Sequence, residues 1–143
     1  ALLNGIENSV DDRADTAQRF WEAVAPQFPE WEAVRASRLS AGEVRQDFIH
    51  SHGIVLHALG IAGRDLVPAR PDSWTQDLER LREIDWRRSN TALWEGRALL
   101  GGRVSKARQN LVLTTNTIKI QLQLPLGPDE RRVEEAYAQG RSA

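Results

Sequence analysis

Residues 93–124 read LWEGRALLGGRVSKARQNLVLTTNTIKIQLQL, and charge, glycine content and hydrophobic pattern all change within this stretch. After Ser105, which can cap a helix, residues suited to one buried helical face recur at steps of three and four. These inward-facing residues are Ala107, Leu111, Thr115, Ile118 and Leu122. We therefore predict a helix from Lys106 to about Gln121.

Part of the same stretch also fits a strand. IKIQLQL, residues 118–124, alternates with period two, and TTNT at 114–117 consists of poor helix formers. We retain the helix as the prediction. The pair Gly101-Gly102 can bring backbone N–H groups close to a phosphate, but no strand-loop-helix context supports a nucleotide fingerprint.

Basic residues concentrate around this helix. Residues 86–119 contain seven basic residues and one acidic residue, whereas residues 1–34 contain two basic and seven acidic residues, in a chain of net charge −1. Arginine and lysine that neutralise phosphates supply most non-specific nucleic-acid affinity, although a solvated or internally paired basic face is the alternative. The expected DNA contacts are Arg87, Arg88, Arg97, Arg103, Lys106, Arg108, Asn110 and Lys119. Among them, Arg103, Lys106 and Arg108 cluster at the amino end of the predicted helix, where free N–H groups also favour phosphate. Asn110 and Asn116 are the residues expected to read base edges.

Length and composition predict one globular domain. The 143 residues are 41% hydrophobic and 27% charged, and the sequence contains no apolar run near the ~20 residues that a membrane span needs. The absence of cysteine excludes disulfides, thiolate zinc sites and a cysteine nucleophile. We expect a cytoplasmic protein, and an opening within an apolar pattern without methionine suggests a fragment of a longer polypeptide.

The remaining patterns predict an all-α fold of five to six helices, as a single compact domain over residues 1–143. Helical spacing and capping residues indicate helices over residues 10–24, a short turn from 29, 41–59, 73–84 and 128–140, with a loop over 60–71. The expected shared core contains Trp21, Phe48, Val55, Leu78, Leu111 and Ile118.

The histidines lie in the predicted 41–59 helix. At 100° per residue, His52 and Arg45 border the core, whereas His50 and His57 lie on the outer face. His50 and His52 then point about 160° apart and cannot share a metal ion, so we expect neither a metal site nor a cofactor. His52 is predicted to be a hydrogen-bonded core histidine, or a polar contact beside Arg45 in a pocket or interface.

Three stretches resemble a known family: VRQDFIHSHGIVLHALG at 44–60, IDWRRSNTALWEGRALLGGRVSKARQNLVLTTNTIKIQL at 84–122, and LPLGPDERRVEEAY at 124–137. They are similar to the C-terminal region of DndB, a protein of bacterial DNA phosphorothioation systems. DndB belongs to the DGQHR-domain group, and the motif of that name is absent here. The resemblance implies a helical domain of a DNA-binding transcriptional repressor of the modification genes, to which NTPase activity has also been attributed.

Three functions remain open. The leading one is a DNA-binding regulatory domain with phosphorothioation proteins as further partners. A scaffold or homo-oligomerisation domain is the second, because Val112, Leu113 and Ile120 lie off the core stripe of the 106–121 helix. The third is a part of an NTPase whose active site lies outside this fragment. We do not expect the fragment itself to be an enzyme, because its histidines split between two helix faces and no nucleophile accompanies them.

Overall fold

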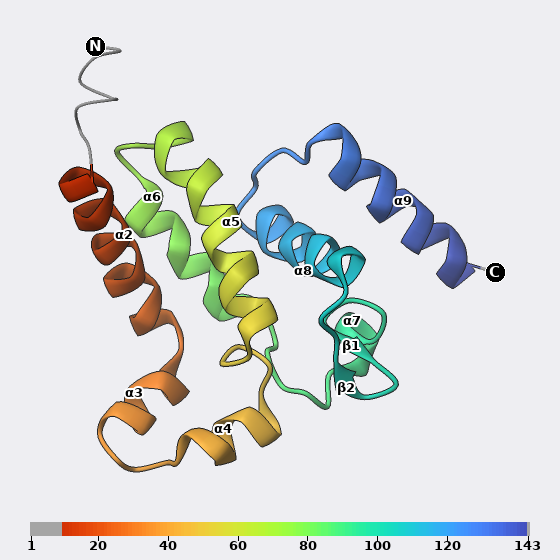
Figure 1. Cartoon of the computed structure of the whole chain (residues 1–143), viewed down its shortest axis with the longest axis horizontal. Coiled ribbons are helices and arrows are strands. Elements are labelled where there is room, and N and C mark those ends of the chain that lie inside the picture. Colours follow the sequence, from red (N-terminus) through yellow and green to blue (C-terminus); the bar gives the residue numbers. More distant parts are fainter. Residues whose placement is uncertain (1–9, 143) are drawn as a thin grey trace.

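Helices dominate the computed structural model, which describes residues 10–142 (Figure 1). The α-helices are α2 (Val10–Val24), α3 (Pro29–Arg35), α4 (Ala41–Asp47), α5 (Gly53–Ala69), α6 (Trp74–Asp77), α7 (Thr91–Trp94), α8 (Arg108–Gln121) and α9 (Pro128–Ser142). Two 3-10 helices, η1 (Ala25–Gln27) and η2 (Leu78–Glu83), and one antiparallel hairpin, β1 (Leu99–Leu100) with β2 (Arg103–Val104), complete the described part. The fold is mainly helical as predicted, but residues 10–142 form eight α-helices where we expected five or six in the chain.

Helix α5 lies at the centre of the structure, between α2 on one side and α8 on the other, and α9 lies beyond α8 (Figure 1). Its apolar residues recur at helical spacing, and Val55, Leu59 and Leu66 are fully buried. From α8, Ile118 joins the same core. The predicted helix over 106–121 is therefore confirmed, and the competing strand interpretation of IKIQLQL is wrong.

All six residues expected in the core belong to it or pack against it, but they differ in burial. Val55, Leu78 and Ile118 are fully buried, whereas Trp21, Phe48 and Leu111 are half-buried and pack against the core from its edge. In α2 the helical spacing of Val10, Ala14, Ala17, Trp21 and Val24 predicts one buried face. The buried side chains are Phe20 and Val24, while the smaller Ala14 and Ala17 are exposed, and the side chain of Val10 lies outside the described residues.

The predicted helix over 41–59 is wrong, because the chain leaves helical geometry between α4 and α5. Phe48 ends α4 in an extended conformation, with φ −128° and ψ 156°. The backbone here pairs with a distant segment: Ile49 N donates to Trp86 O at 3.0 Å, and Arg88 N donates to Asp47 O at 2.8 Å. This interruption reverses the predicted histidine positions, because His50 becomes fully buried and His52 becomes the half-buried residue that precedes α5.

The predicted loop over 60–71 is also wrong, because α5 continues through it to Ala69. One of its two glycines serves close packing against α2, because a Cβ at Gly63 would overlap the ring of Phe20. A Cβ at Gly60 would lie 3.9 Å from the Trp21 ring, an ordinary contact. Helix packing therefore explains Gly63 without a turn. No helix of the described residues is long and apolar enough to cross a membrane.

Candidate nucleic-acid interface

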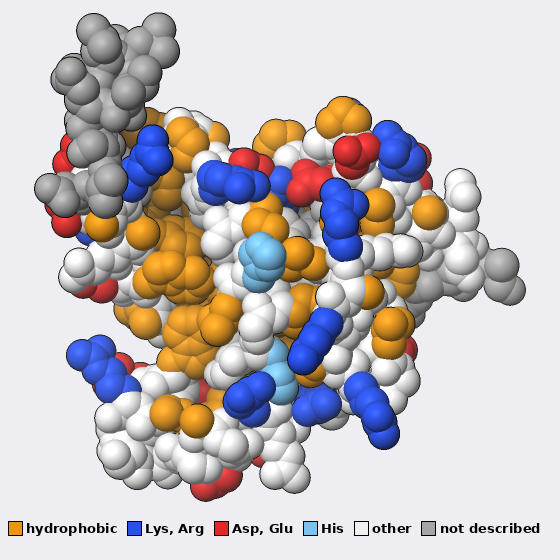
Figure 2. Space-filling model, viewed as in Figure 1, with side chains coloured by type: hydrophobic (Ala, Val, Ile, Leu, Met, Phe, Trp, Pro, Cys, Tyr) orange, Lys and Arg blue, Asp and Glu red, His pale blue; other side chains and the backbone are white. Residues whose placement is uncertain are grey.

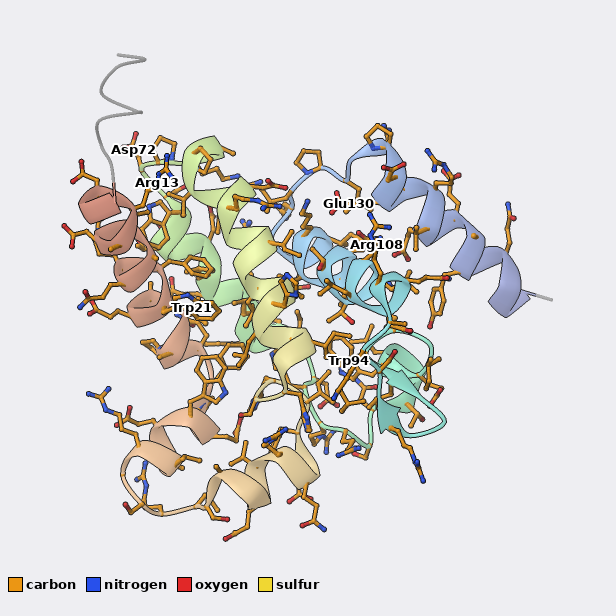
Figure 3. The ribbon with its side chains drawn as sticks, in the orientation of Figure 1. Arg13, Trp21, Asp72, Trp94, Arg108 and Glu130 are labelled. Carbon is orange, nitrogen blue, oxygen red and sulfur yellow. The ribbon has the colours of Figure 1, made fainter. Side chains whose placement is uncertain are left out.

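Lys119 is a buried basic residue that connects three helices. Its side chain is 4% exposed, and its Nζ donates to both carboxylate oxygens of Glu130, at 3.0 and 2.8 Å. Asp65 of α5 supplies a second carboxylate. Burial acts to lower the pKa of Lys119, but the hydrogen bonds that it donates to these two carboxylates, together with their charge, outweigh burial and raise that pKa. Glu130 lies at the start of α9, labelled in Figure 3, so Lys119 fastens α9 and α5 to α8.

Arg97 is the second predicted contact that has an internal role. Its guanidinium donates to both carboxylate oxygens of Glu134, at 2.9 and 2.6 Å, and to the carbonyl of Leu113. It also lies over the ring of Tyr137, 4.5 Å from the centroid. The hydrogen bond and charge of Arg97 hold the pKa of Glu134 below its usual value. Arg97 thus anchors α9 to the segment between α7 and β1.

The two asparagines expected near DNA bases are also buried. Asn110 is 5% exposed, accepts from Ser105 Oγ at 2.8 Å and donates to Gly96 O at 2.9 Å. Asn116 is fully buried and donates to the carbonyl of Glu130 at 3.0 Å. Both amides therefore hold internal turns and helices together. The DNA-binding hypothesis no longer rests on Asn110, Asn116, Lys119 or Arg97.

Arg87 and Arg88 differ from each other despite being neighbours. Arg87 forms a two-point ion pair with Asp85, whose contacts measure 2.9 and 2.8 Å, and the pair is exposed. Arg88 forms no ion pair with a described carboxylate and donates instead to two carbonyl oxygens, Arg45 O and Gly102 O, both at 3.3 Å. Arg88 therefore joins the end of α4 to the β1–β2 turn and keeps its positive charge uncompensated.

Three predicted contacts remain exposed. Arg103, Lys106 and Arg108 form no ion pair with any described carboxylate. They follow one another along β2, the connection to α8 and the first turn of α8, where Figure 3 labels Arg108. The hairpin that presents Arg103 is fixed by Glu95, whose carboxylate accepts from the backbone N–H groups of Gly101 and Gly102 at 2.7 and 3.0 Å.

A cavity of about 380 Å³ opens beside these residues, where α4, α5 and the connection into α8 meet. Four of its lining side chains are basic or can become so, and no described residue that lines it is acidic. They are Arg45, His52, His57 and Lys106. Figure 2 shows pale-blue histidine side chains close to blue Lys and Arg side chains on one face of the molecule.

The backbone around the cavity is also electropositive. Its lining includes Gly53 and Ile54 at the amino end of α5, and Ser105 and Lys106 directly before α8. Neither helix has a side-chain hydrogen bond at its N-cap or an acidic residue in its first turn. The first N–H groups of a helix have no partner within the helix and attract anions. Basic side chains and helix N–H groups therefore both contribute positive electrostatic potential to this face.

Residues 1–125 match the family described as DndB, DNA-sulfur modification-associated. The chain belongs to this family. No curated protein and no solved structure matches it. The basic cavity, the hairpin and α8 all lie within the range that matches the DndB family, and the ion-paired helix α9 follows that range.

The sequence of this DndB-family chain predicted some residues of the site but not the backbone arrangement that brings them together. It singled out Arg45 and His52, which both line the cavity, and His57, which is exposed as predicted. It placed Arg45 and His52 in one continuous helix, whereas a hydrogen bond from His52 Nε2 to Arg45 O, 2.8 Å long, closes the interruption between α4 and α5. The connection from Arg88 to Arg45 was missed, because 43 residues separate them.

Proposed function

We propose that this DndB-family chain binds the sugar–phosphate backbone of duplex DNA through its basic face, as a regulatory domain of DNA phosphorothioation. The basic face is defined as Arg45, Arg88, Arg103, Lys106 and Arg108. The observation that carries the proposal is that these charges lack carboxylate partners among the described residues, whereas Arg87, Arg97 and Lys119 are neutralised within the fold. By the family resemblance, its regulatory role is repression of the modification genes.

Backbone contacts of this kind make a specific prediction about salt. Each phosphate neutralised by arginine or lysine releases counterions, so log K falls with log salt with a slope of about −0.9 per contact. A face of five cations allows a slope of a few units. Recognition of base sequence is not part of this proposal, because Asn110 and Asn116 are buried and their side-chain amides donate hydrogen bonds within the fold.

The experiment is a salt-dependent DNA-binding titration with charge-reversal variants. Changing Arg103 and Arg108 together to glutamate should weaken binding to every duplex tested and flatten the salt slope by about one unit for each phosphate that is no longer neutralised. The control is Arg35→Glu with Arg38→Glu, which makes the same charge change at two exposed residues at and after the end of α3. Equal losses of affinity in both double variants would show a general charge effect and contradict a localised site.

Self-association, the alternative function, has less support because two of the three apolar residues on which it relied are not exposed. It relied on three apolar residues of α8 being exposed, but Leu113 is 1% exposed, Val112 is half-buried, and Ile120 alone of the three is exposed, at 53%. A single exposed isoleucine is common on monomeric proteins. Light scattering beside the DNA titration distinguishes the two functions.

A further inference from the structure

The cavity on the basic face is lined by two chemically different sets of side chains. One set, called the cationic wall, consists of positive or ionisable groups, from Arg45, His52, His57 and Lys106. The other set, called the apolar wall, consists of three half-buried apolar side chains, Ile54, Val104 and Leu111. A site for an ordinary phosphate would be expected to offer hydrogen-bond donors on every side, since an oxyanion against an apolar wall gives up its bonds to water. The presence of the apolar wall in an anion-binding cavity therefore requires an explanation.

A phosphorothioate matches such a cavity better than a phosphate does. In a phosphorothioate linkage, sulfur replaces one non-bridging oxygen of the DNA backbone, and the group keeps its single negative charge. The sulfur is larger, more polarisable and a weaker hydrogen-bond acceptor than oxygen, so removing it from water costs less and contact with apolar carbon is more favourable. The remaining non-bridging oxygen still requires donors, which the cationic wall supplies.

We propose that this cavity preferentially accepts a phosphorothioate linkage of DNA, with the sulfur against Ile54, Val104 and Leu111 and the oxygen toward Lys106 and Arg45. This inference rests on the proposed DNA-binding function and specifies the ligand of the same face. The cavity volume of about 380 Å³ is sufficient for one backbone linkage and not for a folded partner. The matched family is itself described as DNA-sulfur modification-associated. A domain built in this way would respond to the product of the modification.

Matched duplexes test the preference directly. Two duplexes of one sequence, with either one phosphorothioate linkage of defined configuration at phosphorus or none, are titrated against the full 143-residue chain. We expect about three- to tenfold tighter binding of one phosphorothioate diastereomer, because a cavity lined by both cationic and apolar side chains accommodates the sulfur of one configuration better than that of the other. Lys106→Ala should weaken binding of modified and unmodified duplexes alike, because it removes a charge contact common to both.

The apolar wall is tested by a matched pair of substitutions. Ile54→Thr places a hydroxyl on the cavity wall and should bring the phosphorothioate preference close to one. Ile120→Thr makes the same chemical change on α8 outside the lining and should leave the preference intact. Val104→Thr, an isosteric change in the hairpin, is the second variant to be used if Ile54→Thr fails to fold.

The outcomes separate this inference from the proposed function. Salt-dependent binding that is equal for unmodified DNA and both diastereomers would overturn the phosphorothioate preference and leave DNA binding intact. A preference that survives both Ile54→Thr and Val104→Thr would overturn its assignment to this cavity. If no duplex binds in a salt-dependent manner, the proposed function itself fails, and the inference fails with it.

Discussion

His50 donates a hydrogen bond from Nε2 to Oε1 of Glu30 over 2.8 Å, from a side chain that is fully buried. Its other ring nitrogen, Nδ1, accepts from Trp31 Nε1 at 3.1 Å. Because an indole N–H can only donate, the proton of the neutral imidazole must lie on Nε2. The ring thereby ties α3 to the extended segment between α4 and α5 and lies within a cluster of aromatic rings, stacked on Phe48 with centroids 5.0 Å apart.

Removal of the His50 ring should destabilise the fold more than removal of the exposed His57 ring. His50→Ala should lower the free energy of unfolding by about 2–4 kcal/mol, since it creates a cavity and leaves the indole N–H of Trp31 without its partner. His57→Ala should change it by less than about 0.5 kcal/mol, because that side chain is exposed. Urea unfolding of both variants provides the measurement, and similar decreases at the two positions would contradict the assignment.

Stability should also fall on mild acidification. Burial lowers the pKa of His50 below its ordinary value near 6.5, while the hydrogen bond and charge of Glu30 act in the opposite direction with less effect. The unfolded chain therefore takes up this proton at a higher pH than the native state does. The contribution of neutral His50 is complete above pH 6.5 and is lost as the pH falls below it toward the native pKa, by up to about 1.4 kcal/mol per pH unit.

The matched variant for this pH dependence is His50→Gln, whose amide can still donate and accept but does not titrate. Unfolding free energies at pH 7 and pH 5 are compared for the two proteins. The wild type should lose more stability over this interval than the variant does. Parallel decreases would assign the pH dependence to other groups.

The sequence predicted those elements whose signals are local. Helix α8 follows from its apolar spacing, and α9 begins at Pro128 with Asp129 and Glu130 in its first turn, as expected for a helix amino terminus. The interruption between α4 and α5 could not be predicted in this way. It depends on backbone pairing of Phe48 with Arg87, which is distant in sequence, and residues 48–52 alone satisfy a helical pattern.

The candidate site was only partly predictable for a similar reason. A charge count over residues 86–119 gives a balance of +6, but the acids that neutralise Lys119 and Arg97 lie in other segments, at Glu130 and Glu134 of α9 and at Asp65 of α5. A usable signal did exist: Glu130 and Glu134 are four residues apart and share one face of the last helix. An acidic face beside a basic helix indicates pairing between the two.

The two lysines of the chain should behave in opposite ways. Lys119→Ala should lower the free energy of unfolding by about 2–4 kcal/mol, because it leaves the carboxylates of Glu130 and Asp65 facing each other without a cation. Lys106→Ala should change stability by less than about 0.5 kcal/mol and should weaken DNA binding. Thermal or urea unfolding beside a DNA titration separates the two effects. A folded Lys119→Ala protein of normal stability would refute the structural role.

Replacement of Gly96 should destabilise the fold, because both its backbone conformation and the nearby Tyr137 ring disfavour a side chain there. Its φ is +86°, and a Cβ built there would lie 2.7 Å from Cε1 of Tyr137, whose hydroxyl donates to Glu95 O at 2.8 Å. Gly96→Ala should therefore cost about 2–4 kcal/mol, from left-handed strain and from displacement of the tyrosine that docks α9. Gly101→Ala is the control: its φ is +59°, but no atom lies within 4 Å of its Cβ position, so only the backbone strain of about 1–2 kcal/mol applies.

A double-mutant cycle isolates the contact between Gly96 and Tyr137. If displacement of the ring accounts for the extra cost, Gly96→Ala should be less destabilising in a Tyr137→Ala background than in the wild type, by about the difference between the Gly96→Ala and Gly101→Ala effects. The strain at φ +86° remains in both backgrounds and cancels in the cycle. Urea unfolding of the two single variants and the double variant yields the coupling energy. Strictly additive effects would show that α9 is held without this close approach.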